Sequence, residues 1–106
     1  MLKAMFFLHR RADLSIDEFR RYSREVHIPL VSRVPGLERY VVNYTALNPF
    51  GAKQACDGVA ELWFASADAF QAALGSPEGS VALADQANYL DMGRTHALVM
   101  EEQTVR

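Results

Sequence analysis

The segment VAELWF, residues 59–64, decides the fold because its side chains sort into two rows. Alternate residues of a β-strand point to opposite faces of a sheet. One row is entirely apolar and consists of Ala60, Leu62 and Phe64. The other row is apolar apart from one carboxylate and consists of Val59, Glu61 and Trp63. A strand of this kind predicts a sheet with helices on one face and a further apolar cover on the other.

Three other segments have the composition of strands. Lys3 to His9 is an apolar run that is too short for a stable helix, and Leu37 to Ala46 is rich in β-branched and aromatic residues. Thr95 to Glu101 has the same character. The first segment repeats the double pattern, with Ala4, Phe6 and Leu8 in one row and Lys3, Met5, Phe7 and His9 in the other.

An amphipathic helix is expected between the first two of these strands. Ser15 and Glu18 have the spacing of a reciprocal capping box, which satisfies free amide groups at a helix start. Apolar residues then recur at helical spacing, and the pattern predicts a helix that reaches about Arg33. Pro35-Gly36 ends it.

A second helical region follows residues 59–64. Ser66 can cap a helix through Leu74, and Ser76-Pro77 can open another, so we expect a break near Gly75. Residues 48–57 are expected to form a loop between two antiparallel strands. The resulting order, βαββαβ, predicts an α+β fold of the ferredoxin-like type, with four antiparallel strands and the helices on one face.

Length and composition narrow the possible functions. A chain of 106 residues fits one domain, spanning residues 1–106, and its formal charge of −2 with interspersed signs argues against a nucleic-acid partner. We predict no membrane span and no signal peptide. Cys56 is the single cysteine, which excludes an internal disulfide and favours a cytoplasmic location.

The face of the sheet that the helices do not cover is expected to need another cover. Several strands repeat the apolar second row, and together they would expose more apolar surface than monomers usually carry. The helices already cover the other side, so the economical cover is the same sheet of a second copy. We therefore predict a two-fold homodimer. The alternative is a monomer with an exposed apolar surface.

His27 is the leading candidate for chemistry. It stands four residues after Ser23, so the imidazole and the hydroxyl share one helix face, with Tyr22 at its edge. Histidine exchanges protons near neutral pH, which suits a general acid or base in a pocket. The alternative is a structural histidine that stabilises the end of the helix.

Glu61 is the second catalytic candidate, because a carboxylate in an apolar strand needs a partner or a raised pKa. It is expected to orient a histidine or to take a proton, and a structural ion pair is the alternative. The predicted ligand-binding residues are Tyr22, Ser23, Phe7, Asn43, Tyr44, Trp63 and His96. We expect no metal, since the three histidines lack a short ligand spacing, and no nucleotide cofactor, since there is no glycine-rich phosphate loop.

The chain resembles the EthD-like members of the dimeric α/β barrel superfamily over nearly its whole length. The matching stretches are Leu14-Ser15 to Tyr22, His27-x-Pro29-Leu30, Pro35-Gly36-Leu37 with Tyr40, and residues 57–64. The resemblance implies a homodimer whose two sheets form a barrel, with a pocket between each sheet and its first helix. It also implies that His27 matches a recurring helix histidine. Ser23 departs from the pattern, because similar proteins often have tryptophan there.

The leading functional hypothesis is a small-molecule enzyme without a cofactor, acting on a small apolar, cyclic or aromatic ligand. His27 would transfer a proton, Glu61 would orient it, and aromatic residues would exclude water. Relatives on this fold include cofactor-free oxygenases, isomerases and cyclases, so the reaction type stays open. The competing hypothesis is a non-catalytic binding or accessory protein for a partner oxygenase. A haem-handling enzyme is a third and remoter hypothesis.

Overall fold

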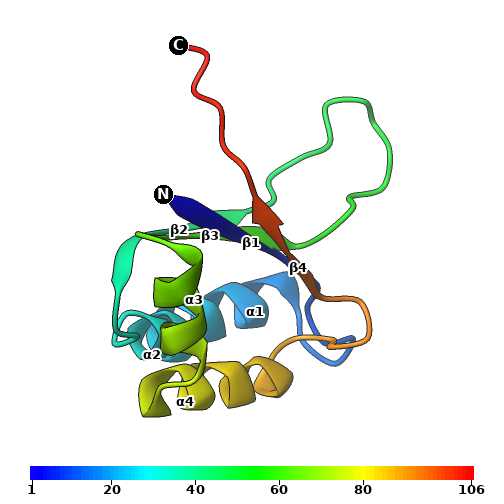
Figure 1. The fold of residues 1–106 in the computed structure, drawn as a ribbon. Coiled ribbons are helices and arrows are strands. Elements are labelled where there is room, and N and C mark those ends of the chain that lie inside the picture. Colours follow the sequence, from blue (N-terminus) through cyan, green and yellow to red (C-terminus); the bar gives the residue numbers. More distant parts are fainter.

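The computed structural model describes residues 1–106 and consists of a four-stranded sheet with helices on one face (Figure 1). The strands are β1 (Leu2–Leu8), β2 (Leu37–Tyr44), β3 (Gly58–Phe64) and β4 (His96–Met100). They are antiparallel and lie in the order β2-β3-β1-β4. The helical elements are α1 (Ile16–Tyr22), the π-helical segment η1 (Ser23–His27), α2 (Ile28–Val31), α3 (Ala67–Leu74), α4 (Pro77–Asp85) and the short 3-10 segment η2 (Gln86–Asn88).

This arrangement confirms the predicted fold class, the order of the strands and helices, and the placement of the helices on one face. The expected strand bounds differ from the observed ones by one or two residues at the ends. None of the helices has the length and apolar character that spanning a lipid bilayer requires.

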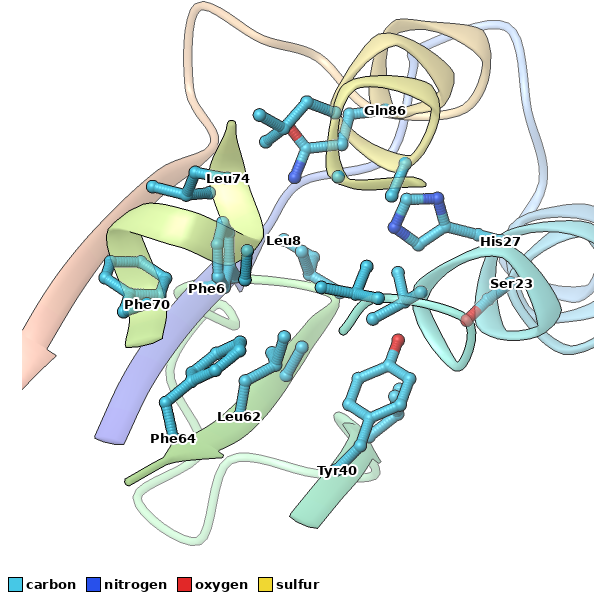
Figure 2. A pocket seen from close by; sticks show the side chains of 18 of the residues that line it. Phe6, Leu8, Ser23, His27, Tyr40, Leu62, Phe64, Phe70, Leu74 and Gln86 are labelled. Carbon is cyan, nitrogen blue, oxygen red and sulfur yellow. The ribbon is translucent and has the colours of Figure 1, made fainter. Parts of the chain in front are cut away.

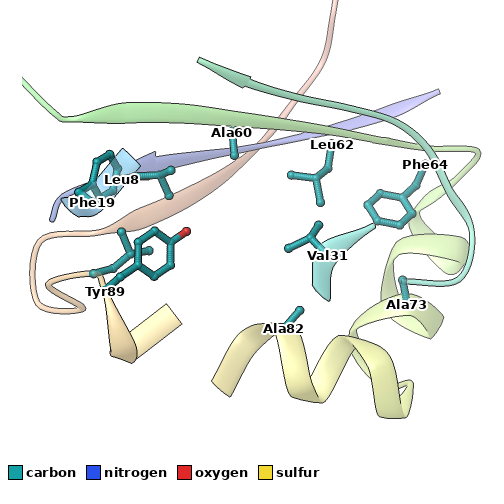
Figure 3. Close-up of a cluster of buried hydrophobic side chains, with 10 residues drawn as sticks. Leu8, Phe19, Val31, Ala60, Leu62, Phe64, Ala73, Ala82 and Tyr89 are labelled. Carbon is teal, nitrogen blue, oxygen red and sulfur yellow. The ribbon is translucent and has the colours of Figure 1, made fainter. Parts of the chain in front are cut away.

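The core lies between the sheet and the helices, as the first apolar row predicts (Figure 3). Leu8 of β1 and Ala60, Leu62 and Phe64 of β3 point into it. Phe19 of α1 is fully buried against them. Burying side chains of this size contributes about 1.5–3 kcal/mol each, so these rows hold the helices against the sheet.

The opposite face of the sheet carries no helix (Figure 1). Strand register and alternation assign twelve side chains to it: Lys3, Met5, Phe7, Arg39, Val41, Asn43, Val59, Glu61, Trp63, His96, Leu98 and Met100. Seven of these are apolar, and Leu98 remains 50% exposed. The expected second apolar row is therefore present, and we call these twelve residues the helix-free face.

The first helix differs from the prediction. The sequence pattern predicts one continuous helix to about Arg33, whereas the structure inserts η1 between α1 and α2. Within η1 the amide of Ile28 donates to the carbonyl of Ser23, five residues earlier. Pro29 has no amide hydrogen, and its ring would clash with the carbonyl of Glu25 in a regular α-helix. A wider turn relieves that clash, and such turns are frequent at functional sites.

The break in the second helical region is confirmed. The side chain of Ser66 caps α3 and that of Ser76 caps α4. Each accepts a hydrogen bond from the backbone amide of the residue three positions later. Gly79 lies at the start of α4, against the end of α3, where a Cβ atom would clash with the backbone carbonyl oxygen of Ala73. Close packing of the two helices thus requires glycine at this position.

Gly79→Ala is expected to lower the free energy of unfolding by about 1–3 kcal/mol, because the added methyl group meets backbone that cannot move aside cheaply. Gly75→Ala is the matched control. A Cβ atom at Gly75 comes no closer than 3.6 Å to any neighbour, so this change should alter stability by less than about 0.5 kcal/mol. Urea unfolding of both variants checks this, and equal stabilities would contradict the close-packing explanation.

Candidate functional site

An apolar cavity lies between the sheet and the helices (Figure 2). Its internal volume is about 60 Å³, and fifteen of its nineteen lining residues are hydrophobic. Strands β1, β2 and β3 form its floor, and the helical layer forms its walls. Pockets for small organic ligands share this composition, which is mostly apolar with a few polar groups.

The π-helical segment η1 brings two polar side chains to this cavity. Ser23 and His27 stand at its two ends and are 1% and 7% exposed. The three residues between them, numbered 24–26, are exposed. The predicted sharing of one helix face by the hydroxyl and the imidazole is therefore observed, and both side chains line the cavity.

His27 is held by a carboxylate from the other helical region. Its Nδ1 lies 2.9 Å from Oδ2 of Asp85, the last residue of α4. The other carboxylate oxygen of Asp85 accepts hydrogen bonds from the Tyr22 hydroxyl at 2.6 Å and from the Asn88 amide at 3.0 Å. A carboxylate beside Nδ1 fixes the tautomer that carries hydrogen there. Nε2 is left without a protein partner on the side of the ring that faces the cavity (Figure 2).

The electrostatics of this pair favour a neutral imidazole beside an ionised carboxylate. Burial lowers the pKa of His27 and outweighs the opposing hydrogen bond and charge of Asp85. Burial alone would raise the pKa of Asp85, but hydrogen bonds from Tyr22, Asn88 and His27 together hold it below its usual value. His27 is thus a free base at neutral pH, and Nε2 can accept a proton.

All four tyrosines of the chain surround this site, but their hydroxyls have different surroundings. Tyr22 donates to Asp85, and Tyr44 donates to the hydroxyl of Ser23 at 2.8 Å. Tyr40 and Tyr89 line the cavity, and neither hydroxyl has a hydrogen-bond partner in the protein. The ring of Tyr89 lies 4.9 Å from that of His27, centroid to centroid.

Gln86 also lines the cavity, and its buried side-chain amide forms no hydrogen bond within the protein. Four polar groups are therefore available to a ligand in an otherwise apolar space. They are the His27 Nε2, the hydroxyls of Tyr40 and Tyr89, and the Gln86 amide. No three histidine, cysteine, aspartate or glutamate side chains lie close enough together to hold a metal ion.

The structure separates the predicted site residues into two groups. Ser23 and His27 line the cavity, and Tyr22 and Tyr44 are connected to it by hydrogen bonds to Asp85 and to Ser23. The remaining predicted site residues belong to the helix-free face: Phe7, Asn43, Glu61, Trp63 and His96.

The orienting role expected of Glu61 needs correction. Its carboxylate lies 2.7 Å from the Lys3 ammonium and accepts a hydrogen bond from Asn43 at 2.9 Å, on the face of the sheet away from His27. Hydrogen bonds from Lys3 and Asn43 lower its pKa and outweigh burial. The structural ion pair, which is the alternative left open by the sequence, is formed with Lys3. The carboxylate that contacts His27 belongs to Asp85.

Asp85 was not identified from the sequence, although one signal marks it. The carbonyl end of a helix dipole disfavours a negative charge, and Asp85 ends α4. A carboxylate that stays ionised and buried there needs dedicated donors, and it has three. Tyr89 and Gln86 have no comparable signal, because aromatic and amide side chains near a helix end are ordinary packing residues.

These features define a class of protein: a ferredoxin-like domain with an apolar cavity between its sheet and its helices and a histidine–aspartate pair at the cavity wall. The chain belongs to the EthD family, since the model for the EthD domain matches residues 11–93. The family resemblance inferred from the sequence is thereby confirmed. No curated protein sequence matches the chain.

Solved structures confirm the fold. An EthD-family protein of Bacillus halodurans C-125 is 19% identical with a TM-score of 0.83, and the match covers 97% of this chain and 100% of that one. An Arabidopsis thaliana protein is 12% identical with a TM-score of 0.75, covering 100% and 99%. A dimeric ferredoxin-like protein of Thermobifida fusca YX is 17% identical with a TM-score of 0.72, covering 93% and 88%.

Proposed function

We propose that this EthD-family chain is a small-molecule enzyme in which His27 transfers a proton at a cyclic or aromatic ligand held in the cavity. The observation that carries the proposal is the pairing of His27 Nδ1 with Asp85, which leaves Nε2 unpaired at an apolar cavity. A neutral imidazole held by a carboxylate is the arrangement that a general base needs.

The proposed step is removal of a proton from a carbon next to a carbonyl group. The Nε2 lone pair takes the proton, the electrons of the C–H bond form a carbon–carbon double bond, and the carbonyl electrons move onto oxygen. Asp85 stabilises the imidazolium that results. The apolar walls exclude water that would otherwise exchange with the proton. Return of the proton to another carbon is an isomerisation, and attack by the enolate on a second carbonyl is a cyclisation.

Deuterium exchange tests this step even when the final product is unidentified. Cyclic ketones, anthrones and lactones are incubated with the protein in D₂O, and mass spectrometry follows incorporation beside the carbonyl group. Catalysed incorporation for at least one compound is expected. Saturable binding without incorporation across the whole panel would favour the competing hypothesis of a non-catalytic binding or accessory protein.

We propose further that the chain is a homodimer in which the helix-free faces of two copies cover each other. The strongest support is the apolar character of that face, on which Leu98 and Met100 are 50% and 38% exposed. A structural relative is described as dimeric, which agrees with this assembly. Two charged residues of the face do not oppose it, because Lys3 pairs with Glu61, and also with Glu102 outside the face, within one chain.

Leu98→Asp is expected to raise the dimer dissociation constant more than about 10²-fold, because each copy would bury an unpaired charge. Val81→Asp is the matched control, since Val81 is 53% exposed on α4 in the helix layer. Sedimentation at micromolar concentration should show dimers for the parent chain and the control. A monomeric parent chain would refute the proposed assembly.

A further inference from the structure

We infer that Tyr40 and Tyr89 form a two-donor site for a single ligand oxygen, so that the cavity selects planar apolar ketones or phenols with that oxygen at the His27 end. This inference names the substrate class of the proposed reaction and therefore rests on the cavity being the ligand site. It adds two residues that contact the substrate to the histidine and its carboxylate partner.

The first observation is the unequal pairing of the tyrosines. Buried tyrosine hydroxyls usually find a partner, as Tyr22 and Tyr44 do here. Tyr89 is only 1% exposed, yet its hydroxyl has none. Figure 3 shows that this hydroxyl points into the space between the sheet and the helices. The hydroxyl oxygen is not among the fully enclosed unpartnered atoms of the chain, so it is accessible from the cavity and free to bind a ligand atom there.

The second observation is that Tyr40 points into the same cavity from the sheet. Tyr40 rises from β2 with its hydroxyl directed into the cavity (Figure 2), whereas Tyr89 belongs to the segment that follows η2. Two donors from separate elements that face one space can bind both lone pairs of a single oxygen atom. The rest of the cavity is almost entirely apolar, so the remainder of the ligand must be hydrocarbon-like.

The third observation concerns the charge state of the two phenols. Burial raises the pKa of both Tyr40 and Tyr89 far above neutrality, so both hydroxyls keep their hydrogens. Neutral tyrosines are donors that stabilise negative charge as it develops on a carbonyl oxygen.

The position of His27 completes the geometry. The rings of Tyr89 and His27 are in contact, so an oxygen held by Tyr89 lies near Nε2. A ketone in this orientation presents its neighbouring C–H bond to the base while the tyrosines hold its oxygen. A phenol bound in the same way donates its own O–H to Nε2 and accepts from the tyrosines.

A binding cycle tests the inference without requiring turnover. Dissociation constants for 4-chlorophenol and for chlorobenzene, which lacks the hydroxyl, are measured by protein NMR titration with the parent chain, Tyr40→Phe and Tyr89→Phe. Loss of one hydrogen bond should weaken 4-chlorophenol binding about tenfold in each variant. Chlorobenzene binding should change less than about twofold. The difference between the two ligands isolates the hydroxyl contact from any change in packing.

Tyr44→Phe is the comparison variant, because it removes a hydroxyl from the same aromatic group whose partner is Ser23 rather than the cavity. It should change the affinity for both ligands by the same factor. Equal factors for the two ligands in Tyr40→Phe and Tyr89→Phe would overturn the tyrosine site while leaving His27 chemistry in place. Failure of both ligands to bind the parent chain would overturn the cavity itself as the ligand site.

Discussion

Replacement of His27 by alanine is expected to lower the rate of catalysed deuterium incorporation by about 10²–10⁴-fold, the usual contribution of a positioned general base. The loss arises because no other side chain that lines the cavity can act as a base at neutral pH. It should fall mainly on turnover rather than on ligand affinity, since the apolar walls that bind the ligand are unchanged. Steady-state rates on the first compound found to exchange measure both quantities.

The fold should survive this change. Asp85 keeps its hydrogen bonds from Tyr22 and Asn88, so the buried carboxylate is not left without donors. His27→Gln is the second variant, because glutamine retains a hydrogen-bonding side chain of similar size but cannot act as a base at neutral pH. Both variants should melt within a few degrees of the parent chain. Undiminished exchange in either folded variant would remove His27 from the mechanism.

The fold was predictable because its signals are local. The capping box of Ser15 and Glu18 is observed in the structure, and Ser66 and Ser76 cap the two later helices as expected. The two-row pattern of residues 59–64 gave the orientation of the central strand, because a shift of one residue would place Phe64 and its row in solvent. Such features depend on neighbours within a few positions of the chain.

The π-helical segment was not predicted, because helical periodicity assumes one constant turn. Phe19, Ser23 and His27 recur at four-residue spacing, so their common buried face was predictable, whereas the widening of the turn before Pro29 was not. The proline was visible in the sequence. Its effect depends on how the surrounding helix absorbs the missing hydrogen bond, which is a tertiary question.

The carboxylate partner of His27 could not be predicted from local sequence patterns either. Asp85 lies 58 residues from His27, and no spacing rule connects two helices that meet only through the fold. The error on Glu61 has a different origin. The two-row rule already places Glu61 with Val59 and Trp63, on the face away from the helices, so it could not reach a histidine that faces the other side of the sheet.

Asp85→Asn is expected to lower catalysed exchange about 10²-fold or more, with little change in ligand affinity, because it reverses the tautomer of His27. Tyr22 and Asn88 both donate to one oxygen of Asp85 and would hold the amide oxygen of asparagine in that place. The new NH₂ group then faces Nδ1 of His27. Hydrogen moves to Nε2, which can no longer accept a proton from the ligand.

The pH profile separates this positioning role from a merely structural one. The pKa of His27 is below its ordinary value of 6.5, so the acidic limb of kcat/KM in the parent chain should lie below pH 6.5. The charge and hydrogen bond of Asp85 raise that pKa, so their removal should move the limb to still lower pH. Tyr22→Phe removes one donor to Asp85 but leaves the contact with His27, and should keep the limb near its original position. An acidic limb that moves upward in Asp85→Asn would contradict the proposed pairing, because loss of a neighbouring negative charge can only make the imidazole easier to deprotonate.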